Sequence, residues 1–214
     1  MNFERIDRET WARKDYFNHY FKSVPCTYSV CVKLDITRVR ESRQRFYPVM
    51  LYAITRIVNR HPEFRTTFDA DGNLGTYDSM LPCYTVFHQE TEQFSNLWTA
   101  WTDDFAAFCR AYEEDMAAYG QAPGMSPKPG LPENNFPVSM IPWISFEGFN
   151  LNIQTGYDYL LPIFTMGKFY CENGRWLLPF SIQVHHAVCD GFHTSRFLRE
   201  LQELLDQFDN GFQA

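Results

Sequence analysis

The fold of this chain is decided by the stretch Leu178-Pro179-Phe180-Ser181-Ile182-Gln183-Val184-His185-His186-Ala187-Val188-Cys189-Asp190-Gly191-Phe192-His193. Its first half predicts a β-strand, because apolar residues alternate with other residues at Leu178, Phe180, Ile182 and Val184. Beyond Gly191 the spacing changes to three and four, which predicts an amphipathic helix with Phe197, Leu198, Leu201, Leu204, Leu205 and Phe208 buried. The polar residues between them therefore lie at a strand-to-helix junction, where a rigid base leaves side chains reachable for chemistry.

The adjacent histidines His185 and His186 have three interpretations on spacing alone. The first is a polar cap on the end of a strand. The second is a general base, since neutral imidazole is the best base near neutral pH; Asp190 would orient His186 only in a helical segment, whereas Gly191 favours a turn. The third is a metal site with His186 and Asp190 as ligands four apart, which lacks a third ligand at a suitable spacing. We therefore expect no metal.

Size and composition indicate one globular domain. The chain of 214 residues is long enough for one sizeable α/β domain, which we expect to span 1–214. Its 20 Phe, 12 Tyr and 5 Trp suggest a large core and an aromatic ligand pocket. The formal net charge of −7 disfavours a nucleic-acid partner.

The chain also carries no pattern typical of membrane insertion or export. No apolar run approaches the length of a membrane helix, and residues 1–7 contain no apolar signal segment. The six cysteines are scattered without a Cys-x-x-Cys pair, so they indicate small buried apolar residues in a reducing compartment. We therefore expect a cytoplasmic protein without a membrane partner.

Strands and helices alternate along the predicted fold. Periodicity predicts helices over 9–21, 37–61 with a break at Pro48, 102–119, and after Gly191. It predicts strands over 26–36, 64–68, 74–77, 83–88, 163–170 and 175–186, with a loop over 120–136 and a hairpin turn at Asn173-Gly174. The expected fold class is α/β, a two-layer α+β sandwich in which helices pack on a mixed sheet.

The run from Gln183 to His193 resembles the active-site signature of the chloramphenicol acetyltransferases. The looser core His-His-x-x-x-Asp-Gly is shared by a wider group of CoA-dependent acyltransferases. The resemblance extends from Trp11 to about Leu205. It includes Trp11-x-Arg13 with Tyr20, Pro25-Cys26-x-Tyr28-Ser29, Leu34-Asp35-Ile36-Thr37, and the segment from Thr85 to Ser95.

This resemblance implies roles for five residues of the catalytic site, three near the reaction and two that hold the turn. His186 matches the general base that deprotonates the acceptor hydroxyl, without an acyl-enzyme intermediate. Ser139 matches the serine that donates to the oxyanion, and Thr165 matches a threonine that helps to hold a water near that site. Asp190 and Arg13 match a structural ion pair that holds the turn carrying the histidine.

The resemblance also implies the ligands and the assembly. Positions lining the acceptor pocket are matched by Tyr20, Cys26, Tyr28, Leu151 and Ile153, and positions near acetyl-CoA are matched by Trp143 and Lys168. It implies a homotrimer with active sites at subunit interfaces, His186 coming from one subunit and much of the pocket from its neighbour. The expected reaction is transfer of the acetyl group of acetyl-CoA to the 3-hydroxyl of chloramphenicol.

Two alternatives to this reaction stay open at the level of sequence. One is acyl transfer to another acceptor such as a lipoyl thiol, although enzymes of that class normally carry lipoyl domains and this chain has none. The other is a non-catalytic protein that binds hydrophobic drugs on the same fold. A serine hydrolase is disfavoured because there is no Gly-x-Ser-x-Gly elbow.

Overall fold

The protein is described by a computed structural model covering residues 1–152 and 158–212. Its main feature is a seven-stranded mixed sheet. In spatial order the strands are β2 (Thr27–Asp35), β10 (Arg175–His185), β8 (Ile163–Met166), β7 (Asn135–Met140), β5 (Leu81–His88) and β6 (Gln93–Trp98), with β9 (Tyr170–Glu172) paired to β10. The pairs β5–β7 and β7–β8 are parallel and the others are antiparallel.

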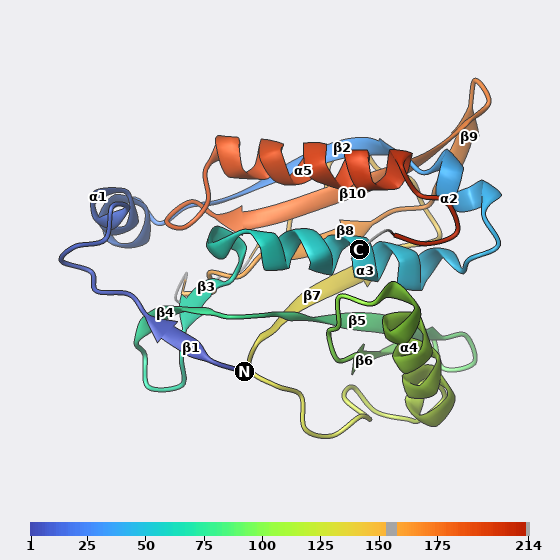
Figure 1. Ribbon diagram of the computed structural model, residues 1–214, viewed down its shortest axis with the longest axis horizontal. Coiled ribbons are helices and arrows are strands. Elements are labelled where there is room, and N and C mark those ends of the chain that lie inside the picture. Colours follow the sequence, from blue (N-terminus) through green and yellow to red (C-terminus); the bar gives the residue numbers. More distant parts are fainter. Residues whose placement is uncertain (153–157, 213–214) are drawn as a thin grey trace.

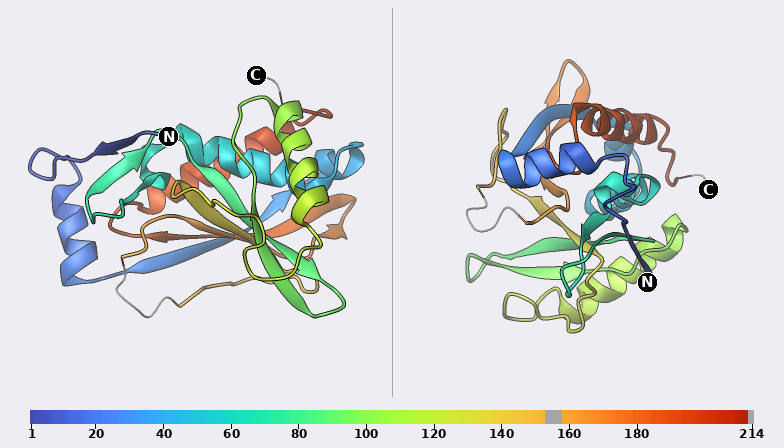
Figure 2. Two further views of the ribbon diagram at one scale, coloured as in Figure 1. Left: turned by 90° about the horizontal axis from the view of Figure 1, so that it is seen from below. Right: turned by 90° about the vertical axis from the view of Figure 1, so that its left-hand side faces the viewer.

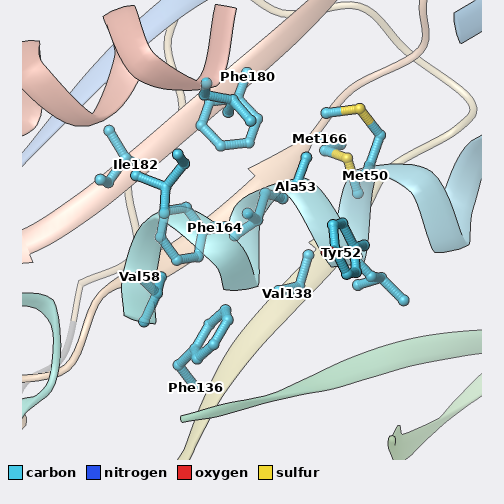
Figure 3. Packing of buried hydrophobic residues seen from close by; sticks show 14 of the residues in the cluster. Met50, Tyr52, Ala53, Val58, Phe136, Val138, Phe164, Met166, Phe180 and Ile182 are labelled. Carbon is cyan, nitrogen blue, oxygen red and sulfur yellow. The ribbon is translucent and has the colours of Figure 1, made fainter. Parts of the chain in front are cut away.

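Helices cover one face of this sheet (Figures 1 and 2). They are α2 (Thr37–Glu41), α3 (Phe46–Arg60), α4 (Phe105–Tyr119) and α5 (Gly191–Asp206). The alternating apolar residues of β10 point toward them, and Phe180 and Ile182 are fully buried with Phe197 and Leu201 of α5. Phe164 of β8 stacks on Phe197 with 5.1 Å between ring centroids. Figure 3 shows this core between α3 and the strands. The predicted mixed sheet with helices packed on it is confirmed.

An N-terminal arm packs beside one end of the large sheet (Figure 1). It contains β1 (Phe3–Arg5), α1 (Lys14–Asn18) and a single π-helical turn, η1 (His19–Ser23). The strand β1 joins β4 (Leu74–Tyr77) and β3 (Thr66–Phe68) in a three-stranded sheet that follows the 3₁₀ turn η2 (Pro62–Phe64). The predicted helix over 9–21 therefore begins five residues later, at Lys14, and the short strand β1 was not predicted.

The predicted break at Pro48 is wrong in position. The chain leaves helical geometry between α2 and α3, and Pro48 lies buried in the first turn of α3. Proline is compatible with a first turn because the backbone N–H it lacks would have no helical partner there. The break is instead held locally by Ser42, whose Oγ donates to the Val39 carbonyl at 2.7 Å. It is also held by Asn210, whose Oδ1 accepts from Arg43 N at 3.2 Å and whose carbonyl accepts from Gln44 Nε2 at 3.1 Å.

The predicted strand over 163–170 is also interrupted. β8 ends at Met166 and β9 begins at Tyr170, because the backbone of Lys168 turns to the loop after β7. The Lys168 N–H donates to the carbonyl of Ile144 at 2.7 Å, and Ser145 Oγ donates to the carbonyl of Lys168 at 2.6 Å. Strand β6 was likewise not predicted, whereas the hairpin turn is present, with Asn173 at φ 52° and Gly174 at φ 77°.

Candidate functional site

His186 lies in a tight turn directly after β10. The carbonyl of His185 accepts from the N–H groups of Val188 at 3.1 Å and Cys189 at 3.0 Å, which closes the turn. The N–H of His186 donates to the carbonyl of Cys26, just before β2, at 2.9 Å. The backbone that carries His186 is therefore held from both sides, and its side chain projects from the end of a strand, as the alternating pattern predicts.

Arg13 fixes this turn from the N-terminal arm. Its Nε donates to the carbonyl of Ala187 at 2.8 Å and its Nη2 to the carbonyl of His186 at 3.1 Å. Its Nη1 donates to Asp190 Oδ2 at 3.0 Å. One guanidinium thus satisfies three acceptors on the segment from His186 to Asp190, a geometry that suits the planar fork of arginine.

Asp190 caps α5. Its Oδ1 accepts from the N–H of Phe192 at 3.1 Å, and His193 Nδ1 accepts from the N–H of Asp190 at 3.1 Å, completing a capping box. Burial opposes ionisation of the carboxyl, but the hydrogen bond from Arg13 and the nearby His193 outweigh it and lower the pKa of Asp190. Because the carboxylate binds Arg13 and the start of α5, it holds the turn in place instead of forming a relay with His186.

Two tyrosines enclose the imidazole of His186. The ring of Tyr20, from η1, stacks on it at 3.8 Å between centroids and 5° between planes, and Tyr28 of β2 meets it edge-on at 5.2 Å. Burial raises the pKa of Tyr28 to about 12, so the phenol stays protonated. The Nδ1 atom of His186 is buried and has no hydrogen-bond partner among the described residues. The ring is thus held by contact on its faces while the residue stays partly exposed.

Ser139 and Thr165 lie in one row across the sheet. Ser139 of β7 is opposite Thr165 of β8, which is opposite Ser181 of β10, and Ser181 is opposite Cys31 of β2. Thr165 is buried and Ser139 is half-buried. This polar row belongs to the sheet face that the helices leave uncovered, since the intervening residues of each strand contribute to the core.

The same register separates Ser139 from His186 within one chain. His186 lies five residues beyond Ser181, roughly 16 Å along the strand, and Ser139 lies two strands away, roughly 10 Å across the sheet. The two Cα atoms are therefore about 15–20 Å apart. A serine and a histidine side chain cannot bridge that distance, so one chain does not bring these two candidate residues together.

The remaining described candidates lie in loops and turns between the strands. Leu151 is anchored to Gln183 through its backbone and leaves its side chain 42% exposed. Trp143 is exposed and packs edge-on against Phe87 at 4.6 Å, and Lys168 is exposed. Ile153 lies outside the described residues. The role of Gln183 as a backbone anchor was not predicted, and its place in the motif was the only available signal.

A cleft lies behind the turn. Its volume is about 570 Å³, and it is lined by Arg13, Val188 and His193 together with the N-terminal arm, but not by His186. Cys189 is fully buried beside it; burial raises the pKa of this thiol well above its ordinary value, so it is a packed thiol and not a nucleophile. Within residues 1–152 and 158–212 no cluster of metal-ligating side chains and no helix able to span a membrane was found.

Comparison with known proteins decides the family. The family model described as chloramphenicol acetyltransferase matches residues 1–202. The chain belongs to the chloramphenicol acetyltransferase family. Chloramphenicol acetyltransferase of Clostridium perfringens is 60% identical over 206 residues, covering 96% of this chain and 100% of the relative. That of Vibrio anguillarum is 57% identical over 210 residues, covering 98% and 97%. The resemblance and the predicted enzyme class, acyltransferase, are confirmed.

Solved structures agree on the fold. A chloramphenicol acetyltransferase structure superposes with a TM-score of 0.83 at 24% identity, covering 95% of this chain and 100% of that one. The truncated catalytic core of the 2-oxoacid dehydrogenase multienzyme complex from Thermoplasma acidophilum superposes with a TM-score of 0.66 at 13% identity, covering 89% and 92%. At these identities the likeness establishes the two-layer fold alone.

Proposed function

We propose that this chain transfers the acetyl group of acetyl-CoA to the 3-hydroxyl of chloramphenicol and thereby inactivates the antibiotic. The observation that carries the proposal is the His186 imidazole, stacked on Tyr20 and borne by a turn that Arg13 and Asp190 hold. The relatives at 57–60% identity are named chloramphenicol acetyltransferase and are matched over 97–100% of their length, which supports acetyl transfer to this antibiotic. We expect the chain to act as one domain over residues 1–214.

In this mechanism His186 is the general base. Its Nε2 takes the proton of the acceptor hydroxyl as the oxygen attacks the thioester carbonyl, because the other ring nitrogen, Nδ1, is buried. The carbon–oxygen bond forms, and Ser139 Oγ donates a hydrogen bond to the tetrahedral oxyanion. Collapse of the intermediate breaks the carbon–sulfur bond, and the proton on His186 passes to the leaving thiolate of CoA. Thr165, next to Ser139 in the sheet, would hold a water at this site.

The separation of Ser139 from His186 supports a site built from two chains. If these residues act on one substrate, His186 of one subunit faces Ser139 of another, and a cyclic homotrimer repeats that interface three times. The acceptor pocket would be lined by Tyr20, Cys26, Tyr28 and Leu151. Trp143 and Lys168, both exposed in one protomer, would contact the coenzyme. The sheet face without helices is the surface available for this assembly.

A coupled assay tests the proposal. Incubation with acetyl-CoA, chloramphenicol and a thiol reagent should release free CoA, and mass spectrometry should find the 3-O-acetyl product. His186→Ala should lower kcat by roughly 10²–10⁴, because the base is removed. Its circular dichroism spectrum should stay unchanged, because the turn is held through the backbone of His186 and not through the imidazole. Substantial acetylation by His186→Ala would refute the mechanism. Antibiotic binding without CoA release by the wild-type chain would favour a drug-binding protein.

A further inference from the structure

Side chains of β10 and β2 hold a loop segment across the sheet face opposite the helices. Ser181 and Cys31 are direct cross-strand partners, and both contact the backbone of Phe149. Ser181 Oγ donates to the Phe149 carbonyl at 3.1 Å, and the Phe149 N–H donates to Cys31 Sγ at 3.3 Å. The loop is therefore attached to the sheet through its backbone at this row.

Gln183 makes the stronger attachment in the next row. Its Oε1 accepts from the N–H of Leu151 at 2.7 Å, and its Nε2 donates to the carbonyl of Leu151 at 2.8 Å. The side-chain amide thus pairs with both backbone groups of one residue, as a neighbouring strand would. Ser29 Oγ, from the cross-strand partner, donates to the same Oε1 at 3.2 Å, so this oxygen accepts two hydrogen bonds. Gln183 is only 6% exposed, so loss of its partners would leave buried polar groups unpaired.

This attachment lies between the candidate catalytic groups. Gln183 lies on β10, three residues before His186 of the following turn, and the row of Ser181 continues through Thr165 to Ser139. Leu151 is 42% exposed, and it is a candidate wall of the acceptor pocket. The position of that wall relative to the sheet is therefore set by the amide of Gln183.

We propose that Gln183 is a positioning residue for acceptor binding, which holds Leu151 in place through paired hydrogen bonds to its backbone. This inference rests on the proposed function. Gln183 touches neither substrate nor reacting atoms in the proposal, so its removal should weaken acceptor binding and leave the chemical step largely intact. Two neutral hydrogen bonds of ordinary strength correspond to an effect of about tenfold.

The test uses Gln183→Met, which keeps the length of the side chain and removes both hydrogen bonds. We expect the KM for chloramphenicol to rise about tenfold, with kcat and the KM for acetyl-CoA within about threefold of wild type. Amide hydrogen exchange of a peptide containing Leu151 should accelerate, because that N–H loses its acceptor. The matched control is Ser29→Ala, which removes one bond to the same amide but leaves the Leu151 pairing, and should change the acceptor KM less than twofold.

An unchanged acceptor KM in a folded Gln183→Met variant, or an equal loss in all three kinetic constants, would overturn the inference. If that variant does not fold, Gln183→Glu replaces it. Its carboxylate still accepts from Leu151 N–H but cannot donate to the Leu151 carbonyl, so the KM for chloramphenicol should rise several-fold while kcat stays within about threefold of wild type; an unchanged acceptor KM refutes the proposal. Absence of acetylation by the wild-type chain would refute the proposed function instead, and exchange at Leu151 would still decide whether Gln183 holds the segment.

Discussion

At the scale of single residues, the ion pair of Arg13 and Asp190 decides how firmly the histidine turn is held. The Arg13 side chain is 16% exposed and that of Asp190 is 36% exposed, so solvent weakens the pair but does not remove it. Asp190→Asn should therefore lower the free energy of unfolding by about 1–2 kcal/mol at pH 7.

This effect should depend on pH with a defined sign. Folding lowers the pKa of Asp190 below its ordinary value of 3.8, so the ionised carboxylate stabilises the folded state above pH 3.8. That contribution is lost as the pH falls from 3.8 through the lower pKa of the folded state. Urea unfolding of wild type and Asp190→Asn should show the difference in their free energies of unfolding narrowing below pH 3.8. The control, Asp71→Asn at an exposed position, should stay within about 0.5 kcal/mol of wild type. A difference that is constant from pH 7 to pH 3 would contradict this assignment.

At the scale of elements, two glycines in turns have different structural requirements. Gly174, in the β9–β10 hairpin, has φ 77°, which disfavours any side chain. Gly191, the first residue of α5, is outside the left-handed region, and a Cβ there would meet nothing within 4 Å. Thermal unfolding should show Gly174→Ala destabilised by about 1 kcal/mol and Gly191→Ala unchanged or slightly more stable.

A Gly174→Ala variant as stable as wild type would contradict the strain expected at φ 77°. Destabilisation by Gly191→Ala would indicate a contact at the start of α5 that the open space around this residue does not show. Only stability is compared, because Gly191 directly follows Asp190 in the motif and a change there could also alter activity.

At the scale of the whole molecule, the distance between Ser139 and His186 makes a prediction about assembly. Both His186→Ala and Ser139→Ala should be nearly inactive alone, the serine change costing roughly 10²–10³ in kcat. Unfolding the two together and refolding them should restore about one quarter of wild-type activity, because a random trimer pairs an intact histidine with an intact neighbouring serine at about one site in four.

The control for this experiment is mixing without unfolding, which should restore no activity while the trimers stay intact. Sedimentation analysis should give three times the mass of the 25.3 kDa chain. The shared site would be refuted if the protein is a monomer. It would also be refuted if the two variants refold together correctly but regain no activity, since one chain would then have to supply both groups.

Local sequence was sufficient wherever one element decides its own conformation. The alternation from Leu178 to Val184 predicts β10, Asn173-Gly174 predicts the hairpin, and the spacing after Gly191 predicts α5; all three are present. By contrast, the break between α2 and α3 was misplaced, and it is held in part by contacts from Asn210, far away in the sequence. The early end of β8 was missed for a similar reason, because the backbone of Lys168 bonds to Ile144 and Ser145 in the loop after β7.

The sequence by itself determined the strand, the helix and the motif between them, because hydrophobic periodicity and the run from Gln183 to His193 are local properties of the chain. Only the tertiary structure decided that Tyr20 stacks on His186, that Gln183 holds the backbone of Leu151, and that Ser139 lies about 15–20 Å from His186. Those relations depend on strand order and register, which pair residues up to 158 positions apart and which no local pattern encodes.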